Sequence, residues 1–421
     1  MLFSPAYRRL LLLLLLLFSA GTANAIRVSA YQVAAQINAD QKLVTVDMTL
    51  TLQSNGEDSV YLLLNKNAQI MSITSGKQAL PYIFRVKGTS DNMFLEDGRR
   101  LTIKTTSLAA GTNQLRFRYS CIFSDLRHGG TSFTDDLIEL NLYAAWFPLN
   151  FDYGRFTHHI RLQVPPDFTV SGTGVVSHKS DNWELVRTQP DNDMVVLASK
   201  KIKTKLFQQN NGAIRIHYIN LTDAQADSTL ALCKDVYSYL QSLFGSANGR
   251  NLTVFIDPTK GITSYSRSGF IALQTKGKTP AEISFLIGHE IGHFWWNKAN
   301  KTTWEDWLNE SFAEYSALLY LKRQRGQVAF DQKIESYQKQ TQTSPPIRNL
   351  NREANGAGNV LYKKGPVVLY GIQQQVGEEK FLNWLKFVAE QKTSTTAELL
   401  QGIETTFSAD MRQSVEQALV K

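Results

Sequence analysis

The residues best suited to chemistry are two histidines and a glutamate within five positions, His289-Glu290-Ile291-Gly292-His293. Residues four apart on a helix share one face, so both imidazoles can reach a single cation. The glutamate between them then points towards whatever that cation binds. Zinc suits imidazole ligands, and a catalytic zinc site usually has three protein ligands and leaves one position for water. The pattern therefore predicts a catalytic zinc site whose third ligand lies a short way downstream.

The flanking sequence predicts two helices that could complete this site. Thr279-Pro280-Ala281-Glu282 is typical of a capping box with proline at the first helical position. A second helix is expected to begin at Thr302 or Thr303 and to end at Gly326. It carries Glu310, and sixteen residues separate this glutamate from the second histidine. Two antiparallel helices joined by a short loop would return Glu310 to the histidine pair, which makes it the predicted third ligand.

Three motifs, in order, resemble the gluzincin metallopeptidases and specifically the aminopeptidase N family. That family has H-E-x-x-H, then W-L-N-E-G-F-A on the following helix, then Y-x-K-G. This chain has His289 to His293, Trp307-Leu308-Asn309-Glu310-Ser311-Phe312-Ala313, and Tyr362-Lys363-Lys364-Gly365. The resemblance implies one zinc ion per chain and a thermolysin-like catalytic domain. It assigns the zinc ligands to His289, His293 and Glu310, the general base to Glu290, and transition-state stabilisation to Tyr362.

General chemistry supports these roles. Zinc can lower the pKa of a bound water from about 15.7 to roughly 7, and Glu290 can take that proton and later pass it to the leaving amine. The Tyr362 hydroxyl can donate to the oxyanion that forms. Without the resemblance, Tyr362 is read more simply as a half-buried aromatic with a satisfied hydroxyl. Glu314, one turn after Glu310, either accepts the free ring N–H of a ligand histidine or lies on a solvated helix face.

The segment before the zinc motif bears on the substrate. Exopeptidases of the family carry Gly-Ala-Met-Glu-Asn there, and its glutamate binds the free amino terminus of the substrate. Between Asp257 and Glu282 this chain has no acidic residue, and Arg267 is among several basic ones. We therefore expect an endopeptidase or a peptidase of unusual specificity, with Arg267 as a candidate substrate-binding residue that would tolerate acidic substrates. The alternatives are an aminopeptidase whose amine-binding acid lies elsewhere in the chain, and a non-catalytic binding protein that retains the peptidase fold.

The first 25 residues are typical of a secretory signal. Arg8 and Arg9 precede an apolar run, and Ala23-Asn24-Ala25 provides a small-x-small cleavage site. The run is too short to span a bilayer unaided. We expect a signal peptide over 1–25 that is cleaved before Ile26, with an uncleaved anchor as the alternative. The mature protein would be periplasmic or extracellular, with no stable membrane span.

The rest of the chain divides into two predicted domains of an α+β protein. Alternating apolar and polar residues, as at 44–52, 114–119 and 159–164, predict an antiparallel β-sandwich over 26–206. A strand at 213–219, a helix at 223–244, a strand at 252–256 and then mainly helices indicate a catalytic domain over 207–421. The chain ends soon after the tyrosine motif, so we expect no large C-terminal helical domain and an open cleft.

The amino-acid composition limits the classes of molecule that the protein is expected to bind. The chain has 45 basic and 37 acidic residues and a formal charge of +8. The predicted signal holds two arginines and no acid, which leaves +6 on the remainder. No long basic block suggests nucleic acid binding, so a peptide or protein substrate is the expected partner. Cys121 and Cys233 either form one bridge or remain buried thiols.

Overall fold

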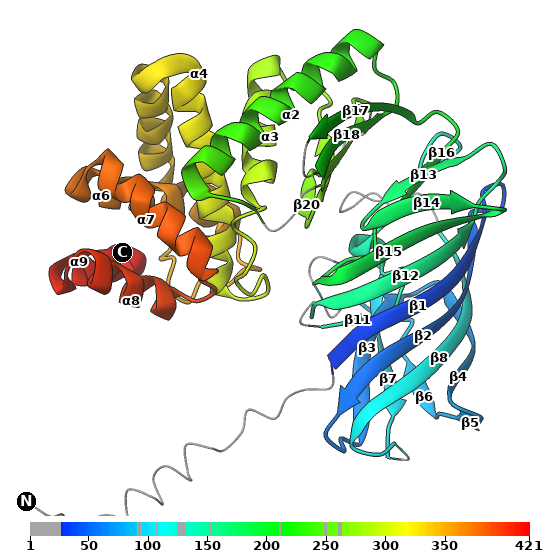
Figure 1. The fold of residues 1–421 in the computed structure, drawn as a ribbon. Coiled ribbons are helices and arrows are strands. Elements are labelled where there is room, and N and C mark those ends of the chain that lie inside the picture. Colours follow the sequence, from blue (N-terminus) through cyan, green and yellow to red (C-terminus); the bar gives the residue numbers. More distant parts are fainter. Residues whose placement is uncertain are drawn as a thin grey trace, which may run out of the picture.

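The computed structural model describes residues 27–421, except 91, 93–94, 107, 124–131, 152–153, 210–211, 248–250 and 260–262. The predicted signal, Met1–Ala25, lies outside the described residues. Among the helices described, none combines the length and the apolar character needed to cross a membrane. A β-rich domain is followed by a domain that contains a smaller sheet and a group of helices, which confirms the predicted fold class (Figure 1).

The β-rich domain is built on a twisted eight-stranded sheet of order β14-β15-β12-β1-β2-β8-β4-β5. Its pairs are antiparallel except β1 with β12, which run parallel. Along β2, alternate residues from Val44 to Leu52 are buried while their neighbours are more exposed, as the sequence pattern predicts. The strands of this sheet are β1 Arg27–Asn38, β2 Leu43–Ser54, β4 Ala68–Ser75, β5 Gln78–Ala79, β8 Gly111–Ile122, β12 Phe156–Gln163, β14 Val175–Lys179 and β15 Asn182–Asp191.

Two four-stranded sheets pack against the large sheet and enclose one apolar core. Trp146 and Phe117 are fully buried in that core, and the Trp146 indole donates to the carbonyl of Met194 at 2.9 Å. The first small sheet contains β11 Leu149–Asn150, β3 Ser59–Asn65, β7 Gly98–Lys104 and β6 Tyr82–Phe84. The second contains β13 Thr169–Gly172, β16 Val196–Ser199, β10 Ile138–Leu140 and β9 Ser132–Phe133, and a short helix η1 covers Leu142–Ala144.

The second domain, which the sequence predicts to be the catalytic domain and which keeps that name below, begins with a mixed five-stranded sheet of order β17-β18-β19-β21-β20. Its strands are β17 Lys203–Gln209, β18 Gly212–Tyr218, β19 Asn251–Asp257, β20 Tyr265–Arg267 and β21 Phe270–Gln274, and helix α2 covers Asp223–Phe244. The predicted domain boundary at 206 falls inside β17. The edge strand β20 is antiparallel to β21, and its Tyr265 and Arg267 bond to residues of the β-rich domain.

Helices make up the rest of the catalytic domain. They are α3 Pro280–Gly292, η2 Trp304–Asp306, α4 Trp307–Thr341, α5 Ala357–Asn359, a π-helical turn η3 Val360–Lys364, α6 Gly365–Val376, α7 Glu378–Gln391, α8 Thr396–Thr406 and α9 Ala409–Val420. The predicted end of the zinc-ligand helix at Gly326 is a sharp kink within α4, because Gly326 has φ 83°. A second helical segment follows the kink.

The two cysteines are not bridged. Cys121 is buried in the core of the β-rich domain, and Cys233 is buried among the catalytic helices. The sequence left open either a disulfide bridge or two buried thiols, and the structure contains two buried thiols.

Candidate metal centre

Helix α3 is positioned by its cap and by two glycines. The Thr279 hydroxyl accepts from the Glu282 N–H at 3.3 Å, and the Glu282 carboxylate accepts from the Thr279 N–H at 2.8 Å, as the capping box predicts. A Cβ at Gly288 would lie 3.1 Å from the Cα of Ala317, and a Cβ at Gly292 would lie 3.1 Å from the Cα of Ala313. The absence of those side chains lets α3 and α4 approach closely enough to share a metal.

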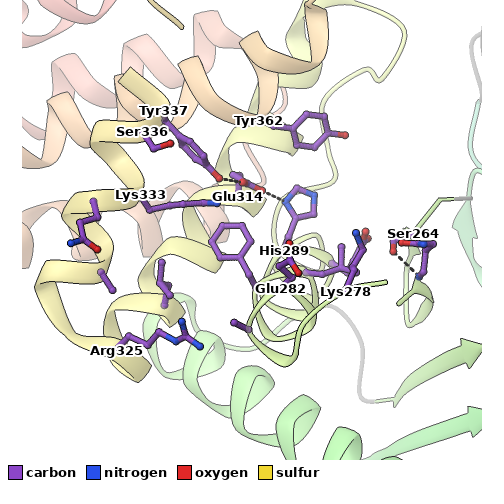
Figure 2. A pocket seen from close by; sticks show the side chains of 18 of the residues that line it. Ser264, Lys278, Glu282, His289, Glu314, Arg325, Lys333, Ser336, Tyr337 and Tyr362 are labelled. Atoms are coloured by element: carbon purple, nitrogen blue, oxygen red, sulfur yellow. Dashed lines mark hydrogen bonds and ion pairs between the residues drawn. The ribbon is translucent and has the colours of Figure 1, made fainter. Parts of the chain in front are cut away.

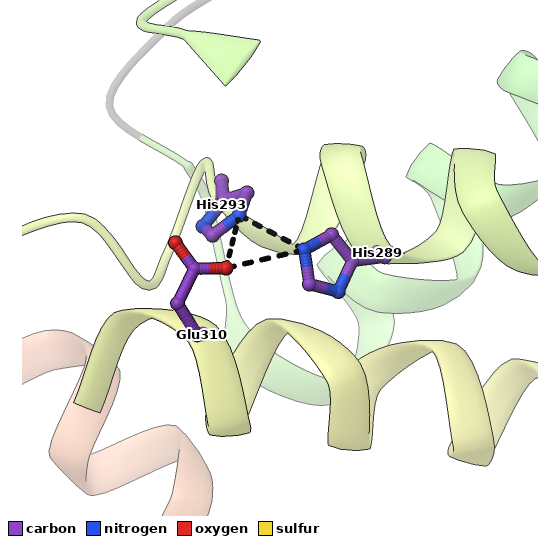
Figure 3. Close-up of side chains that lie close together, drawn as sticks. All are labelled: His289, His293 and Glu310. Carbon is purple, nitrogen blue, oxygen red and sulfur yellow. Dashed lines mark hydrogen bonds and ion pairs between the residues drawn. The ribbon is translucent and has the colours of Figure 1, made fainter. Parts of the chain in front are cut away.

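The three predicted ligands converge at this contact (Figure 3). The Nε2 atoms of His289 and His293 are 3.1 Å apart, and each lies 3.5 Å from Oε2 of Glu310. Zinc–nitrogen bonds of about 2.0–2.1 Å in a tetrahedron place ligand atoms about 3.4 Å apart. The triangle of side-chain atoms therefore has the size of one face of a tetrahedral zinc site.

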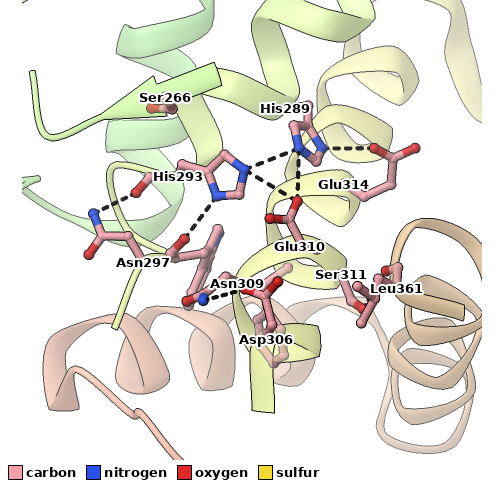
Figure 4. A network of polar contacts seen from close by, with 12 residues as sticks. Ser266, His289, His293, Asn297, Asp306, Asn309, Glu310, Ser311, Glu314 and Leu361 are labelled. Atoms are coloured by element: carbon pink, nitrogen blue, oxygen red, sulfur yellow. Dashed lines mark hydrogen bonds and ion pairs between the residues drawn. The ribbon is translucent and has the colours of Figure 1, made fainter. Parts of the chain in front are cut away.

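Hydrogen bonds fix the tautomer of both histidines (Figure 4). Nδ1 of His289 lies 2.8 Å from a Glu314 carboxylate oxygen, and Nδ1 of His293 lies 3.0 Å from the carbonyl oxygen of Trp296. Both partners are acceptors, so each Nδ1 carries the proton and each Nε2 presents a lone pair. Two lone pairs facing each other beside a carboxylate repel unless a cation lies between them. Oε2 of Glu310 is buried and has no hydrogen-bond donor, which is a second sign that the site is built for a metal.

Glu314 lies behind His289 rather than on a solvated helix face. It is 8 % exposed, one oxygen accepts from His289, and the other accepts from the hydroxyl of Tyr337 on the second segment of α4. The structure thus places Glu314 in the orienting position, which was one of the two interpretations left open. Tyr337 has no motif or spacing that would have revealed this role from the sequence.

The neighbours of Glu310 explain the rest of the W-L-N-E-S motif. Asn309 bonds both the N–H and the carbonyl of Ala299 at 3.1 Å, which ties the loop between the two helices to α4. The Ser311 hydroxyl donates to the carbonyl of Leu361 at 2.6 Å, next to Tyr362. A Cβ at Gly365 would meet Ser311 Oγ at 1.8 Å. The serine that replaces the family's glycine here therefore fits because position 365 has no side chain.

Glu290 and Tyr362 both line the cavities that meet at the site. Glu290 is 5 % exposed, and burial raises its pKa, opposed by the neighbouring histidines. The Tyr362 side chain is 37 % exposed as a whole, but desolvation of its hydroxyl raises its pKa, and the Glu310 carboxylate acts in the same direction. Tyr362 therefore keeps its hydroxyl proton at neutral pH. The rings of Tyr362 and His289 lie 5.6 Å apart, which places the tyrosine beside the predicted metal.

Two cavities meet at the metal centre and share Thr263, Ser264, His289, Glu290 and Tyr362. The sheet-side chamber, about 390 Å³, also contains residues of β20, η1 and the end of β15, including Tyr143, Asp191 and Arg267. The helix-side chamber, about 820 Å³, lies between α3 and the second segment of α4 (Figure 2). A peptide crossing the metal site would place one end in each chamber.

Arg267, the candidate substrate-binding residue, lies in the wall of the sheet-side chamber and is 6 % exposed. Its Nε donates to Asp193 at 2.7 Å, and its guanidinium lies over the rings of Tyr265 and Tyr143. The charge of Arg267 is thus compensated by a buried carboxylate from the β-rich domain. Sequence reasoning missed this pairing because Asp193 is 74 residues away.

The domain order and the His-His-Glu centre define a two-domain zinc metallopeptidase, an enzyme of the hydrolase class. Residues 261–418 match the model of the peptidase family M1 domain. Residues 261–418 therefore form a peptidase M1 domain, and zinc is its cofactor.

Solved structures share the whole fold. An M1 zinc metallopeptidase from Deinococcus radiodurans superposes with a TM-score of 0.74 at 16 % identity over 94 % of each chain. A mutant of that protein bound to a Tyr-Ser-Ala substrate gives 0.73 at 17 % identity over 94 % of each chain. Leukotriene A4 hydrolase from Saccharomyces cerevisiae gives 0.72 at 12 % identity, over 96 % of this chain and 69 % of that one. No curated protein matches the sequence.

The geometry assigns a part to each residue in hydrolysis. When bound, zinc supplies a Lewis acid that polarises a carbonyl and lowers the pKa of water. His289, His293 and Glu310 would hold it, while Glu314 and the Trp296 carbonyl orient the two imidazoles. In the predicted roles, the Glu290 carboxylate would take a proton from water and return it to the leaving nitrogen. The Tyr362 hydroxyl would donate a hydrogen bond to the developing oxyanion.

Proposed function

We propose that this chain is an exported zinc peptidase that does not require a free amino terminus on its substrate. Zinc-dependent peptide hydrolysis follows from the family and the site. The finer proposal rests on one observation, the state of the carboxylates around the sheet-side chamber. An amino-terminal ammonium needs an available carboxylate close to it, because a buried unpaired charge is costly.

Every carboxylate among the described residues of that chamber already has a partner or a role at the metal. Asp306 is paired with Arg352 at 2.7 Å, while Glu290 and Glu310 serve the metal centre. Asp191 accepts from the N–H groups of Asn192 at 2.9 Å and Ser268 at 3.1 Å. These pairings favour a substrate whose backbone continues through the chamber, or one whose amino terminus is blocked.

A second candidate is an aminopeptidase that uses an acid of the β-rich domain. Asp191 favours it, since this residue lines the chamber and comes from outside the segment before α3. Glu139 also lies nearby, but it is fully buried and accepts from the Tyr265 hydroxyl at 2.7 Å. In this case Asp191 would exchange its backbone donors for the substrate ammonium.

Paired peptides with free and acetylated amino termini separate the two candidates. We expect the zinc-loaded protein to cleave both at similar kcat/KM, with internal cuts identified by mass spectrometry. Glu290→Gln, which keeps the metal ligands, is the matched control and should abolish every cut. Stepwise removal of amino-terminal residues, lost on acetylation and weakened in Asp191→Asn, would instead establish the aminopeptidase.

Export is proposed from the sequence of Met1–Ala25. Expression of the full chain in a bacterial host should yield periplasmic or secreted protein that begins at Ile26, as read by intact mass. Retention of the complete chain in the membrane fraction would indicate the uncleaved anchor instead.

A further inference from the structure

The helix-side chamber is the larger of the two cavities at the metal centre and has a distinct lining. Phe285, Leu286 and Ala281 of α3 form one wall, and residues from Leu321 to Tyr337 of α4 form the other. The family resemblance places the amino side of a substrate along the segment that contains β20. Residues 265–268 line only the sheet-side chamber. The helix-side chamber is therefore left for the carboxyl side of the substrate.

Three cationic side chains line this chamber outside any ion pair. Its lining includes Lys278, Arg325 and Lys333, and no ion pair joins any of them to a carboxylate in the described part of the chain. Of its acids, Glu282 is hydrogen-bonded in the capping box, which together with the nearby Lys278 and Lys333 lowers its pKa. Glu314 is hydrogen-bonded by His289 and Tyr337. Glu290 is the catalytic base. The chamber thus presents three cations that form no ion pair in the described part of the chain, and each of its acids is hydrogen-bonded within the fold or assigned to catalysis.

Lys333 is the best placed of the three. It is half-buried, and its Nζ lies 5.1 Å from the centre of the Phe285 ring and 5.2 Å from that of Tyr337. Figure 2 shows it extending from α4 into the chamber on the side of Glu314 and His289. The aromatic faces hold the ammonium in place and shield it partly from water, which strengthens its attraction to an incoming anion.

We propose that Lys333, assisted by Arg325 and Lys278, binds a carboxylate on the carboxyl side of the scissile bond. The ligand is either an acidic side chain or the free carboxyl terminus of the peptide. The proposal deepens the peptidase function and rests on it, because it concerns the same cleft. If the proposal holds, a preference for acidic substrates comes from Lys333 and not from Arg267, because Asp193 compensates the charge of Arg267.

The test uses one peptide scaffold in matched versions. Glutamate replaces glutamine at each position on either side of the cleaved bond in turn, and the carboxyl terminus is either free or amidated. For the wild type we expect kcat/KM about tenfold higher where a carboxylate reaches the chamber, from the strength of a hydrogen bond to a charged group. The glutamate series and the amide comparison separately report the two sources of the carboxylate.

Variants assign the effect to residues. Lys333→Met should remove the preference mainly through KM, with a much larger fall in kcat/KM for acidic than for neutral peptides, whereas Lys333→Arg should restore it. Arg325→Gln should give a smaller loss, and Lys339→Met, on the same helix but outside the chamber, should give none. In the background of Glu290→Gln, peptide binding measured by calorimetry should show the same ratios without turnover.

The outcomes are distinct. Equal effects of Lys333→Met on acidic and neutral peptides, or a preference confined to the amino side of the bond, would overturn the subsite. If acetylated peptides are not cleaved but the Lys333 dependence persists, the proposed tolerance of blocked substrates fails and the subsite stands. If blocked peptides are cleaved without regard to acid content, only the subsite fails.

Discussion

At the residue scale, the metal centre depends on which nitrogen of each histidine carries a proton. Glu314 holds Nδ1–H of His289 and is itself held by Tyr337. Glu314→Gln presents either an amide N–H or a weaker neutral acceptor to that nitrogen, so we expect zinc affinity to fall about 10- to 100-fold. Competition with a chromogenic chelator measures this. Glu335→Gln, on the exposed face of the same helix, should bind zinc like the wild type, and equal affinity in both variants would contradict the orienting role.

Tyr362 differs from the ligands because it is predicted to act on the reaction and not on the metal. Tyr362→Phe removes one donor to the oxyanion, and loss of such a donor costs about 10²–10³ in kcat. Zinc content, measured by atomic absorption, should stay at one per chain. A fall in kcat accompanied by metal loss would show that the hydroxyl supports the metal centre instead.

Sequence reasoning finds side chains that touch the metal more readily than those that orient them. The spacing of His289, His293 and Glu310 follows from helix geometry, and the structure brings all three together. The carbonyl of Trp296 and the hydroxyl of Tyr337 are invisible in the sequence, because any residue offers a carbonyl and a lone tyrosine has no periodic signal. Glu314 was accessible as one of two readings because it lies one helical turn from a ligand.

At the element scale, the site depends on how closely α3 and α4 approach. Gly292→Val would place methyl groups against Ala313 and Ser316, where even a Cβ meets atoms at 3.1 Å. We expect a loss of about 1–3 kcal/mol in the free energy of unfolding, from overpacking, together with weaker zinc binding as the helices separate. Urea unfolding of the metal-free protein isolates the packing effect. Gly371→Ala, where no atom lies within 4 Å of the added Cβ, is the matched control and should not destabilise the protein.

Strand β12 carries a histidine that makes stability depend on pH. His158 is 3 % exposed, and burial lowers its pKa from 6.5 to about 4. Between pH 6.5 and about 4, the His158 imidazole is therefore protonated in the unfolded chain but neutral in the folded chain. Stability is complete above pH 6.5 and falls as the pH drops, by up to about 3 kcal/mol near pH 4.

The matching experiment compares urea unfolding of the metal-free protein at pH 7 and pH 4.5. His158→Gln should lose less stability between the two pH values than the wild type, while the exposed His178→Gln should follow the wild type. Equal pH dependence in all three proteins would show that His158 does not contribute.

The positions of helices and strands were the part of the structure most readily predicted from the sequence. The helix at 223–244 and the capping box at Thr279 appear where the sequence places them. Their signals are local, since caps and periodicity act within a few turns. The parallel pairing of β1 with β12 joins segments more than a hundred residues apart, and nothing in either strand specifies that direction. The second segment of α4 was likewise expected only as helical sequence, and its return alongside Glu314 depends on the kink at Gly326.

At the scale of the whole molecule, Arg267 and Asp193 join the edge of the catalytic sheet to the β-rich domain. Their side chains are 4 % and 0 % exposed, and Asp193 also accepts from the N–H of Leu142 at 2.8 Å. Removing only one partner of a buried ion pair lowers stability strongly, because the other partner remains as an unpaired buried charge. Arg267→Met should therefore lower the free energy of unfolding by about 3–5 kcal/mol, whereas Arg267→Met with Asp193→Asn should recover much of that loss.

The double variant also separates the two roles considered for Arg267. It removes the guanidinium without leaving a buried charge, so the domains should stay joined and zinc content should be unchanged. If Arg267 serves the domain interface, the double variant cleaves acidic and neutral peptides in the wild-type ratio. If it cleaves neutral peptides normally but loses acidic ones, the guanidinium binds substrate despite its pairing with Asp193, and preference for acidic substrates arises on the sheet side of the metal. Measuring kcat/KM for both peptide types, beside Lys333→Met, assigns that preference to one chamber.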